Sequence, residues 1–109
     1  MAGTLELTKS LCWMPAGWVY DNALEGMAGF LDAGLRERML GSLTDINGGY
    51  LDLQNAAHSD IKSVLTALQS LIATTIEAGP AAMHDPSFFD GYIQQLKELE
   101  AMLTQRLNG

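Results

Sequence analysis

No charged side chain interrupts the run SVLTALQSLIATTI, which extends from Ser63 to Ile76 in a chain that is otherwise strongly acidic. A helix at a protein surface normally exposes a charged face, so we expect this run to be enclosed by other helices of the chain or of a second copy. The run is also too short and too rich in Ser, Thr and Gln to span a bilayer, which needs roughly 20 mainly apolar residues. It therefore predicts a buried central helix.

The helical pattern extends beyond this run in both directions. From Tyr50 to Thr75 apolar side chains recur in steps of three and four residues, which aligns them on one face of a helix. A Gly-Pro pair at 79–80 ends the pattern, since proline cannot donate the next backbone hydrogen bond. We predict an unbroken helix over residues 45–78, although capping residue types near Ser59 leave open a break into two helices.

Another helix is predicted over residues 21–40. Asp21 is a suitable N-cap, because its carboxylate can accept a hydrogen bond from a free backbone N–H. Asp32 and Arg36 have the spacing of an ion pair on the polar side, and Gly41 suits the C-terminal end. The predicted buried face contains Leu24, Met27, Leu31, Leu35 and Met39.

The last predicted helix covers residues 86–107. It begins after Asp85, an N-cap residue followed by Pro86, whose missing N–H does no harm in the first turn. An Asn-Gly pair at the end of the sequence suits its termination. Apolar residues again recur at helical spacing, and the predicted buried face contains Phe89, Tyr92, Ile93, Leu96, Leu99, Leu103 and Leu107.

The first twenty residues give conflicting signals. Residues 4–8 alternate polar and apolar side chains like a strand, whereas Leu7, Leu11 and Met14 have the spacing of a short helix. A single strand has no visible pairing partner in this sequence, so we favour a helix. The predicted fold class is all-α: a single helical domain, residues 1–109, in which three main helices form an antiparallel bundle with a short N-terminal segment.

The chain has thirteen acidic and six basic residues, which gives a net charge of −7. This negative charge argues against a nucleic-acid partner and favours a protein partner with a basic surface. The single cysteine, Cys12, allows no intrachain disulfide. The first residues lack a basic region before an apolar stretch, so we expect neither a signal peptide nor association with a membrane. We interpret the chain as a cytoplasmic protein of bacterial style.

Residues that could support catalysis or bind a metal are scattered along the sequence. His58 and His84 are far apart, neither belongs to a His-x-x-x-His or Glu-x-x-His pair, and Cys12 has no second thiol beside it. The glycines do not follow the pattern of a phosphate-binding loop. We therefore expect no metal, no cofactor and no catalytic residue, and we predict that the chain is not an enzyme.

The segment AHSDIK, residues 57–62 of a small acidic chain, resembles the histidine phosphotransfer domains. The resemblance implies that His58, exposed on a bundle helix, accepts a phosphoryl group and has a lysine about one turn later. Lys62 follows four residues after His58, whereas the family usually places its lysine at three. We prefer to interpret His58 as a histidine at the boundary of the buried face, and phosphotransfer is kept as an alternative function.

Both tryptophans lie close together near the start of the chain. Large aromatic side chains are common at binding hot spots, because they bury much surface at a modest entropy cost. They are equally suited to fill the open end of a helical core. The candidate interaction residues are Trp13, Met14, Trp18 and Tyr20, and a helical sensor that binds an apolar ligand near Trp13 and Trp18 is a further alternative.

By elimination, the sequence predicts a non-enzymatic protein–protein interaction module, such as an immunity protein, an antitoxin-type inhibitor or an adaptor. The unequal lengths of the predicted helices also favour self-association. An unbroken helix from Tyr50 to Ala78 would be about 43 Å long, against about 30 Å for its neighbours. A second copy would cover the excess by two-fold pairing, so we expect a homodimer.

Overall fold

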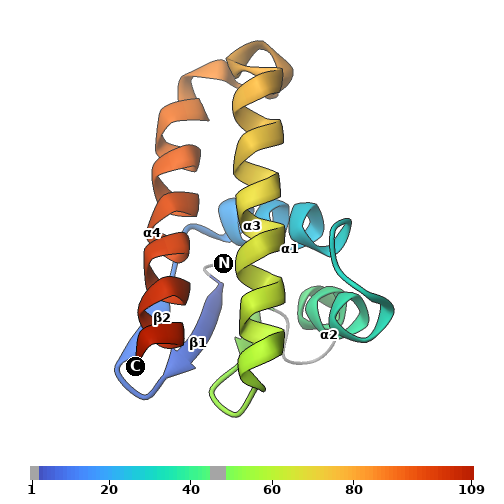
Figure 1. Cartoon of the computed structure of the whole chain (residues 1–109). Helices are drawn as coiled ribbons and strands as arrows, with labels where there is room; N and C mark the ends of the chain where they lie inside the picture. The colour runs from blue at the N-terminus through green and yellow to red at the C-terminus, as the bar shows by residue number, and fades with distance from the viewer. Residues whose placement is uncertain (1–2, 45–48) are drawn as a thin grey trace.

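The structure, a computed structural model that describes residues 3–44 and 49–109, combines helices with a β-sheet (Figure 1). Two 3₁₀ turns connect the last two helices. The described residues form a mixed α/β fold, so the prediction of an all-α bundle of three helices is wrong. The elements are β1 (Thr4–Thr8), β2 (Leu11–Trp13), α1 (Gly17–Ala28), α2 (Ala33–Thr44), β3 (Tyr50–Asp52), α3 (His58–Ala78), η1 (Pro80–Ala82), η2 (Pro86–Phe88) and α4 (Phe89–Asn108).

The N-terminal segment is a strand and not the helix that we favoured. β1 lies in the middle of a three-stranded sheet, antiparallel to β2 and parallel to β3. Leu5 and Leu7 are buried while Thr4, Glu6 and Thr8 are half-buried, which is the two-residue alternation of a strand with one face toward a core. The partners that we could not see in the sequence are β2, directly after β1, and β3, far along the chain, each a strand of only three residues.

Residues 50–57 form strand β3 and a loop instead of the first turns of the long helix. Leu51 and Leu53 are both buried although they are two residues apart, as a strand allows and an amphipathic helix does not. Leu51 pairs with Leu5 of β1. The three- and four-residue steps that suggested a helix here therefore arose by coincidence, from a strand and the loop after it that precede the true helix.

α3 is shorter than the helix predicted over residues 45–78. It begins at His58, after Ala57, whose extended backbone (ψ 150°) stands outside the helix. The alternative of a break near Ser59 is close to this start, but a strand and a loop precede it instead of another helix. The predicted beginning, residues 45–48, lies outside the described residues.

The helix predicted over residues 21–40 is two helices, α1 and α2, separated by a bend. Asp21 lies inside α1 and Gly41 inside α2, so neither has its predicted capping role. The predicted apolar face is nevertheless correct, because the bend preserves its direction toward the core. The buried residues of that face are Leu24, Met27, Leu31, Leu35 and Met39.

Asp32 and Arg36 hold the bend between α1 and α2 through backbone groups. Asp32 Oδ1 accepts a hydrogen bond from the backbone N–H of Leu35 (3.1 Å), so it caps the first turn of α2. Arg36 donates to the carbonyl oxygen of Ala28 (3.0 Å), the last residue of α1, and to that of Leu31 (2.8 Å) in the bend. The two side chains thus form hydrogen bonds with backbone groups at the bend. The sequence spacing had suggested instead that they form an ion pair with each other.

α3 and α4 lie side by side as an antiparallel hairpin (Figure 1). α3 has 21 residues and α4 has 20, so each is about 30 Å long. This removes the overhang from which we predicted a homodimer, and the homodimer stays an untested prediction. Among the described residues, no helix is both long enough and apolar enough to cross a membrane.

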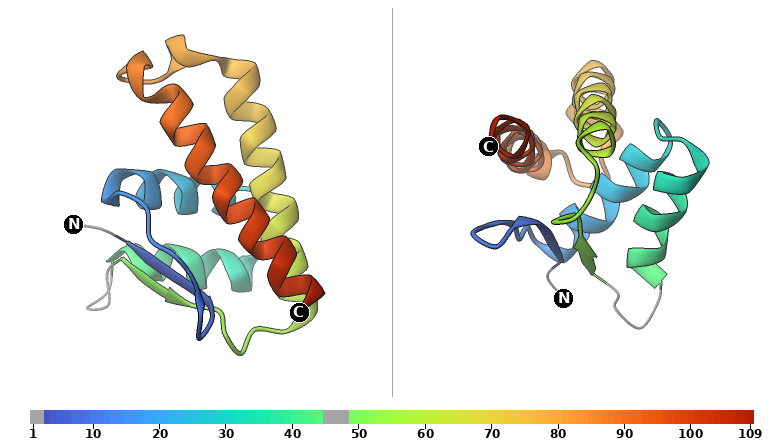
Figure 2. Two further views of the ribbon diagram at one scale, coloured as in Figure 1. Left: turned by 90° about the vertical axis from the view of Figure 1, so that its left-hand side faces the viewer. Right: turned by 60° about the horizontal axis from the view of Figure 1, so that its bottom comes forward.

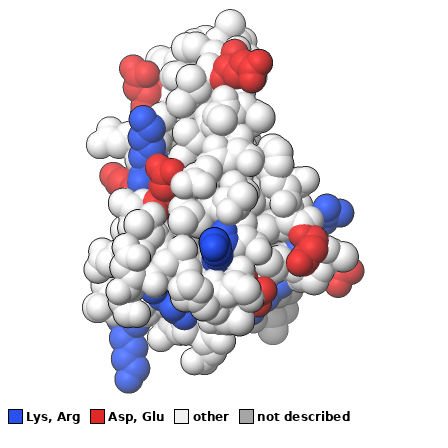
Figure 3. Space-filling view, in the orientation of Figure 1, with Lys and Arg blue, Asp and Glu red and all other residues white. Residues whose placement is uncertain are grey.

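The hydrophobic core lies between the α3–α4 hairpin, the α1–α2 pair and the sheet (Figure 2). α1 contacts all three other helices, whereas α3 buries one face only. Leu68 is fully buried, but Gln69 beside it is exposed. Within this chain the uncharged run is therefore covered on one face only, and few charged atoms lie along α3 in Figure 3. Its enclosure by a second copy stays a prediction. The exposed residues of the uncharged run are Ser63, Thr66, Gln69, Ala73, Thr74 and Ile76.

We expect Gly3→Ala to destabilise the protein by about 1–3 kcal/mol, as overpacking of a core does. A Cβ at position 3 would overlap the ring of Tyr20, which is fixed between Trp13 and a hydrogen bond from its hydroxyl to Ser42 (3.1 Å). Gly41→Ala is the matched control, because a Cβ there meets no atom within 4 Å. It should stabilise α2 by about 0.5–1 kcal/mol. Urea denaturation measures both, and an unchanged Gly3→Ala midpoint would contradict this packing.

Candidate functional site

A cleft of about 420 Å³ opens where the tip of the α3–α4 hairpin meets the start of α1. Figure 2 shows α1 lying across the molecule below the connection between α3 and α4. Three segments far apart in sequence line it: α1, the residues from η1 to η2, and the first turn of α4. We call this the aromatic cleft, and its lining residues are Trp18, Asn22, Ala82, Met83, His84, Asp85, Phe88 and Tyr92.

Three aromatic rings form the wall of the aromatic cleft. The ring centroid of Trp18 lies 5.6 Å from that of Phe88 and 5.6 Å from that of Tyr92, within the range in which aromatic pairs attract. Tyr92 is 7% exposed, whereas Trp18 is 40% exposed and Phe88 is 51% exposed. The rings therefore form a cluster that is anchored in the core at one side and open to solvent at the other.

The backbone between α3 and α4 is shaped by the residue types that the sequence suggested. Gly79 ends α3 with a φ of 78°, which glycine adopts without strain. Asp85 caps η2: its Oδ1 accepts hydrogen bonds from the backbone N–H of Ser87 (3.0 Å) and from the Ser87 hydroxyl (2.7 Å). These two hydrogen bonds lower the pKa of Asp85. A carboxylate is thereby kept ionised at the edge of the aromatic cleft.

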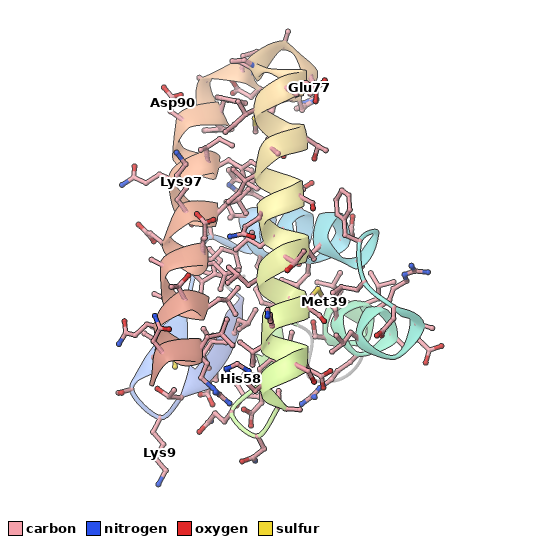
Figure 4. All side chains as sticks on the ribbon, viewed as in Figure 1. Lys9, Met39, His58, Glu77, Asp90 and Lys97 are labelled. Carbon is pink, nitrogen blue, oxygen red and sulfur yellow. The ribbon has the colours of Figure 1, made fainter. Side chains whose placement is uncertain are left out.

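The tip of the hairpin is acidic. Between Lys62 and Lys97 the sequence contains three acids, Glu77, Asp85 and Asp90, and neither Lys nor Arg. Figure 4 shows Glu77 and Asp90 at this end of the molecule, with Lys9 at the opposite end. The aromatic cleft therefore lies in a region of negative charge, which attracts a basic surface and repels an anionic one.

Of the four candidate interaction residues, two are buried in the hydrophobic core and two are exposed at the surface. Trp13 (1% exposed) and Tyr20 (0%) stack in the core at 6.5 Å between ring centroids, and the indole Nε1 of Trp13 donates to the Gln95 carbonyl oxygen (3.0 Å). Trp18 faces the aromatic cleft, and Met14 is 70% exposed but is not among the cleft residues. The structure thus brings only Trp18 of this set into the cleft.

His58 is the exposed first residue of α3. The resemblance to histidine phosphotransfer domains implied a histidine on a helix of an all-helical bundle, and the described residues form neither that bundle nor a helical turn before His58. The other histidine, His84, lines the aromatic cleft beside Asp85. Over residues 3–44 and 49–109, no three side chains among His, Cys, Asp and Glu are grouped so as to bind a metal ion.

Phe88 and Asn22 were missed as site residues by the sequence analysis, and Tyr92 was predicted only as part of a buried helix face. A signal was present at Phe88-Phe89, because two adjacent aromatic residues at a helix start cannot both point into the core. Phe88 is half-exposed while Phe89 is partly buried. No local sequence signal indicated that Phe88 and Tyr92 lie beside Trp18, since that contact depends on how α1 packs against the hairpin.

Stability is expected to fall as the pH rises from about 10 to about 12. Burial raises the pKa of Tyr92 from 10.0 to about 12, so the unfolded chain loses this proton first. The contribution of this proton to the free energy of unfolding is complete below pH 10 and is lost as the pH rises through the pKa of Tyr92 in the folded state. The urea midpoint of wild type should fall relative to that of Tyr92→Phe, which lacks this proton, between about pH 9 and about pH 11.5. A parallel pH dependence of the two proteins would contradict it.

No family model matches the chain, and no curated protein matches it. Among solved structures, the fold is similar to that of an immunity protein in the structure of a CdiA-CT toxin from Burkholderia pseudomallei E479 in complex with its cognate CdiI immunity protein. The TM-score is 0.74, and the superposition covers 97% of this chain and 99% of that chain. The sequences are 14% identical. This likeness shows a shared fold over nearly the whole of both chains.

Proposed function

We propose that this protein is a non-enzymatic immunity-type protein, which binds one toxic partner protein and blocks its activity. The observation that carries the proposal is the shared fold with a CdiI immunity protein in complex with its toxin, over nearly the full length of both chains. The proposal agrees with the interaction module that composition predicts.

Charge supports a basic partner. The net charge of −7 speeds encounter with a positively charged protein, because complementary potentials raise the association rate. Enzymes that act on nucleic acids present such basic surfaces to their substrates, so they are suitable targets for an acidic inhibitor. We therefore propose a partner with a basic surface, and the exposed rings at the hairpin tip as part of the surface that meets it.

A growth experiment tests the proposed function. The tagged full-length chain is used to capture its partner from the native host, and that partner is then expressed alone and together with the chain in a second bacterium. We expect the partner alone to arrest growth and the wild-type chain to restore it, whereas an unfolded Leu68→Asp variant should not. Growth arrest that persists with the wild-type chain, or capture of no stoichiometric partner, would overturn the proposal.

Ligand sensing is a second candidate, favoured by one observation. The aromatic cleft has a volume of about 420 Å³, which falls within the range of about 300–1,000 Å³ that is usual for small-molecule sites. An NMR titration of the ¹⁵N-labelled full-length chain with an uncharged aromatic ligand such as indole tests it. Saturable shifts of the backbone signals of Phe88 and Tyr92 that disappear in Trp18→Leu would support sensing, and an unchanged spectrum at millimolar indole would exclude it for this class of ligand.

A further inference from the structure

The aromatic cleft combines open aromatic rings with a carboxylate. Trp18 and Phe88 are each exposed over a large part of their surface, and their centroids are 5.6 Å apart. Asp85 lines the same cleft and is only partly buried. Aromatic faces attract cations through their quadrupole, and the attraction grows where a carboxylate supplies the counter-charge. This arrangement is suited to an organic cation.

The cleft also offers hydrogen-bond acceptors to such a cation. Both hydrogen bonds from Ser87 end on Oδ1 of Asp85, and no donor among the described residues contacts Oδ2. Asn22 donates its Nδ2 to the Trp18 carbonyl oxygen (2.7 Å), which leaves its own Oδ1 as an acceptor. Two acceptor groups therefore lie on the lining of one cleft, beside the aromatic rings.

The charges around the cleft favour a cation over an anion. Lys62 and Lys97 are the nearest basic residues in sequence on either side of the hairpin tip, and Lys97 points outward from α4 (Figure 4). Arg36 and Arg106 are engaged elsewhere with backbone carbonyl oxygens. No fixed positive charge of the described residues lines the cleft to compete with an incoming cation.

We propose that the aromatic cleft binds an arginine side chain presented by the basic partner protein, with its guanidinium against Trp18 and Phe88 and hydrogen-bonded to Asp85. The inference rests on the proposed function, because it names how the partner is recognised. Arginine fits better than lysine, since the guanidinium is planar, stacks on aromatic rings, is weakly hydrated and can reach Asp85 and Asn22 with different N–H groups.

The test uses a simple probe in place of the partner. The ¹⁵N-labelled full-length chain is titrated with N-acetyl-arginine amide, and the matched probe is N-acetyl-leucine amide. We expect the arginine probe to shift the indole N–H of Trp18 and the backbone signals of Phe88 and Tyr92 in a saturable way at millimolar concentrations. The leucine probe should leave these signals in place. Equal shifts with both probes would overturn the proposal and favour an apolar ligand.

Matched variants assign the binding to the cleft. Asp85→Asn keeps a residue type that caps a helix but removes the charge. It should lower the affinity for the arginine probe by about threefold to fivefold. Trp18→Ala should lower the affinity for the same probe by about twofold to fivefold. Asp90→Asn is the control, because it removes the same charge from the hairpin tip outside the cleft lining. If Asp90→Asn weakens binding as much as Asp85→Asn, the attraction is unspecific and the inference is wrong.

The probe and growth experiments separate this inference from the proposed function. If the wild-type chain protects against its partner while the arginine probe leaves Trp18 unperturbed, the recognition of arginine is wrong and the inhibitor role stands. If the probe binds but no protection occurs, the inhibitor role is wrong, and so is the assignment of the bound arginine to a toxic partner. In a complex with the partner, Trp18→Ala should weaken binding by about thirtyfold, as a hot-spot residue does, and a change below twofold would contradict the inference.

Discussion

Leu68→Asp is expected to unfold the protein. Leu68 is fully buried on α3, so the substitution removes an apolar side chain and places a carboxylate without a partner in the core. Truncation of a buried leucine alone costs about 2–5 kcal/mol, and an unpaired buried charge adds several more. This approaches the total stability of a domain, about 5–15 kcal/mol. Circular dichroism and thermal melting measure the loss.

Gln69→Asp is the matched control for that substitution. Gln69 is the next residue on α3 and is exposed, so the same charge should change the free energy of unfolding by less than about 0.5 kcal/mol. The pair therefore tests the one-sided burial of α3 directly. If both variants unfold, the helix is enclosed on all sides, as the uncharged run first suggested. If Leu68→Asp keeps the wild-type melting temperature, this face is not in the core.

Trp13→Ala is expected to destabilise the protein by about 3–5 kcal/mol, as large-to-small changes of buried aromatic residues do. The indole fills the space between β2, α1 and α4, where it stacks on Tyr20 and donates to the Gln95 carbonyl oxygen. Truncation leaves a cavity and removes this hydrogen bond. Urea denaturation followed by circular dichroism measures the change.

Met14→Ala is the control at the adjacent position. Met14 is 70% exposed, so its truncation should alter stability by less than about 0.5 kcal/mol. Comparable losses at both positions would show that the segment after β2 is arranged differently. A small effect of Trp13→Ala would contradict the role of Trp13 in the core. Trp13 would then again be a candidate interaction residue at the surface.

The buried faces of the helices are predictable from the sequence because burial repeats with the helical period. Leu24, Met27 and Leu31 were assigned correctly, although α1 ends before Leu31. The break itself escaped notice, because Asp32 and Arg36 also have the spacing of an ion pair on one continuous helix. Side-chain periodicity reports which residues face the core, and it is less sensitive to where the backbone bends.

The sheet was not predictable in the same way. β1 shows a clear alternation at Leu5 and Leu7, but a strand requires a partner, and the parallel partner β3 is three residues long. Tyr50 of β3 was absorbed into the apparent helix pattern that continues into α3. Pairing between distant segments depends on the tertiary arrangement, which local propensity does not encode. The same reason hid the aromatic cleft, whose rings come from α1, η2 and α4.

The most direct measurement of the central claim is a titration of the purified partner with the purified chain, while the toxic activity of the partner is assayed. As an inhibitor that acts by binding, the wild-type chain should abolish that activity at a 1:1 molar ratio, and Trp18→Ala should require a higher concentration at equal folding. Full activity of the partner in the presence of excess folded wild-type chain would contradict the account.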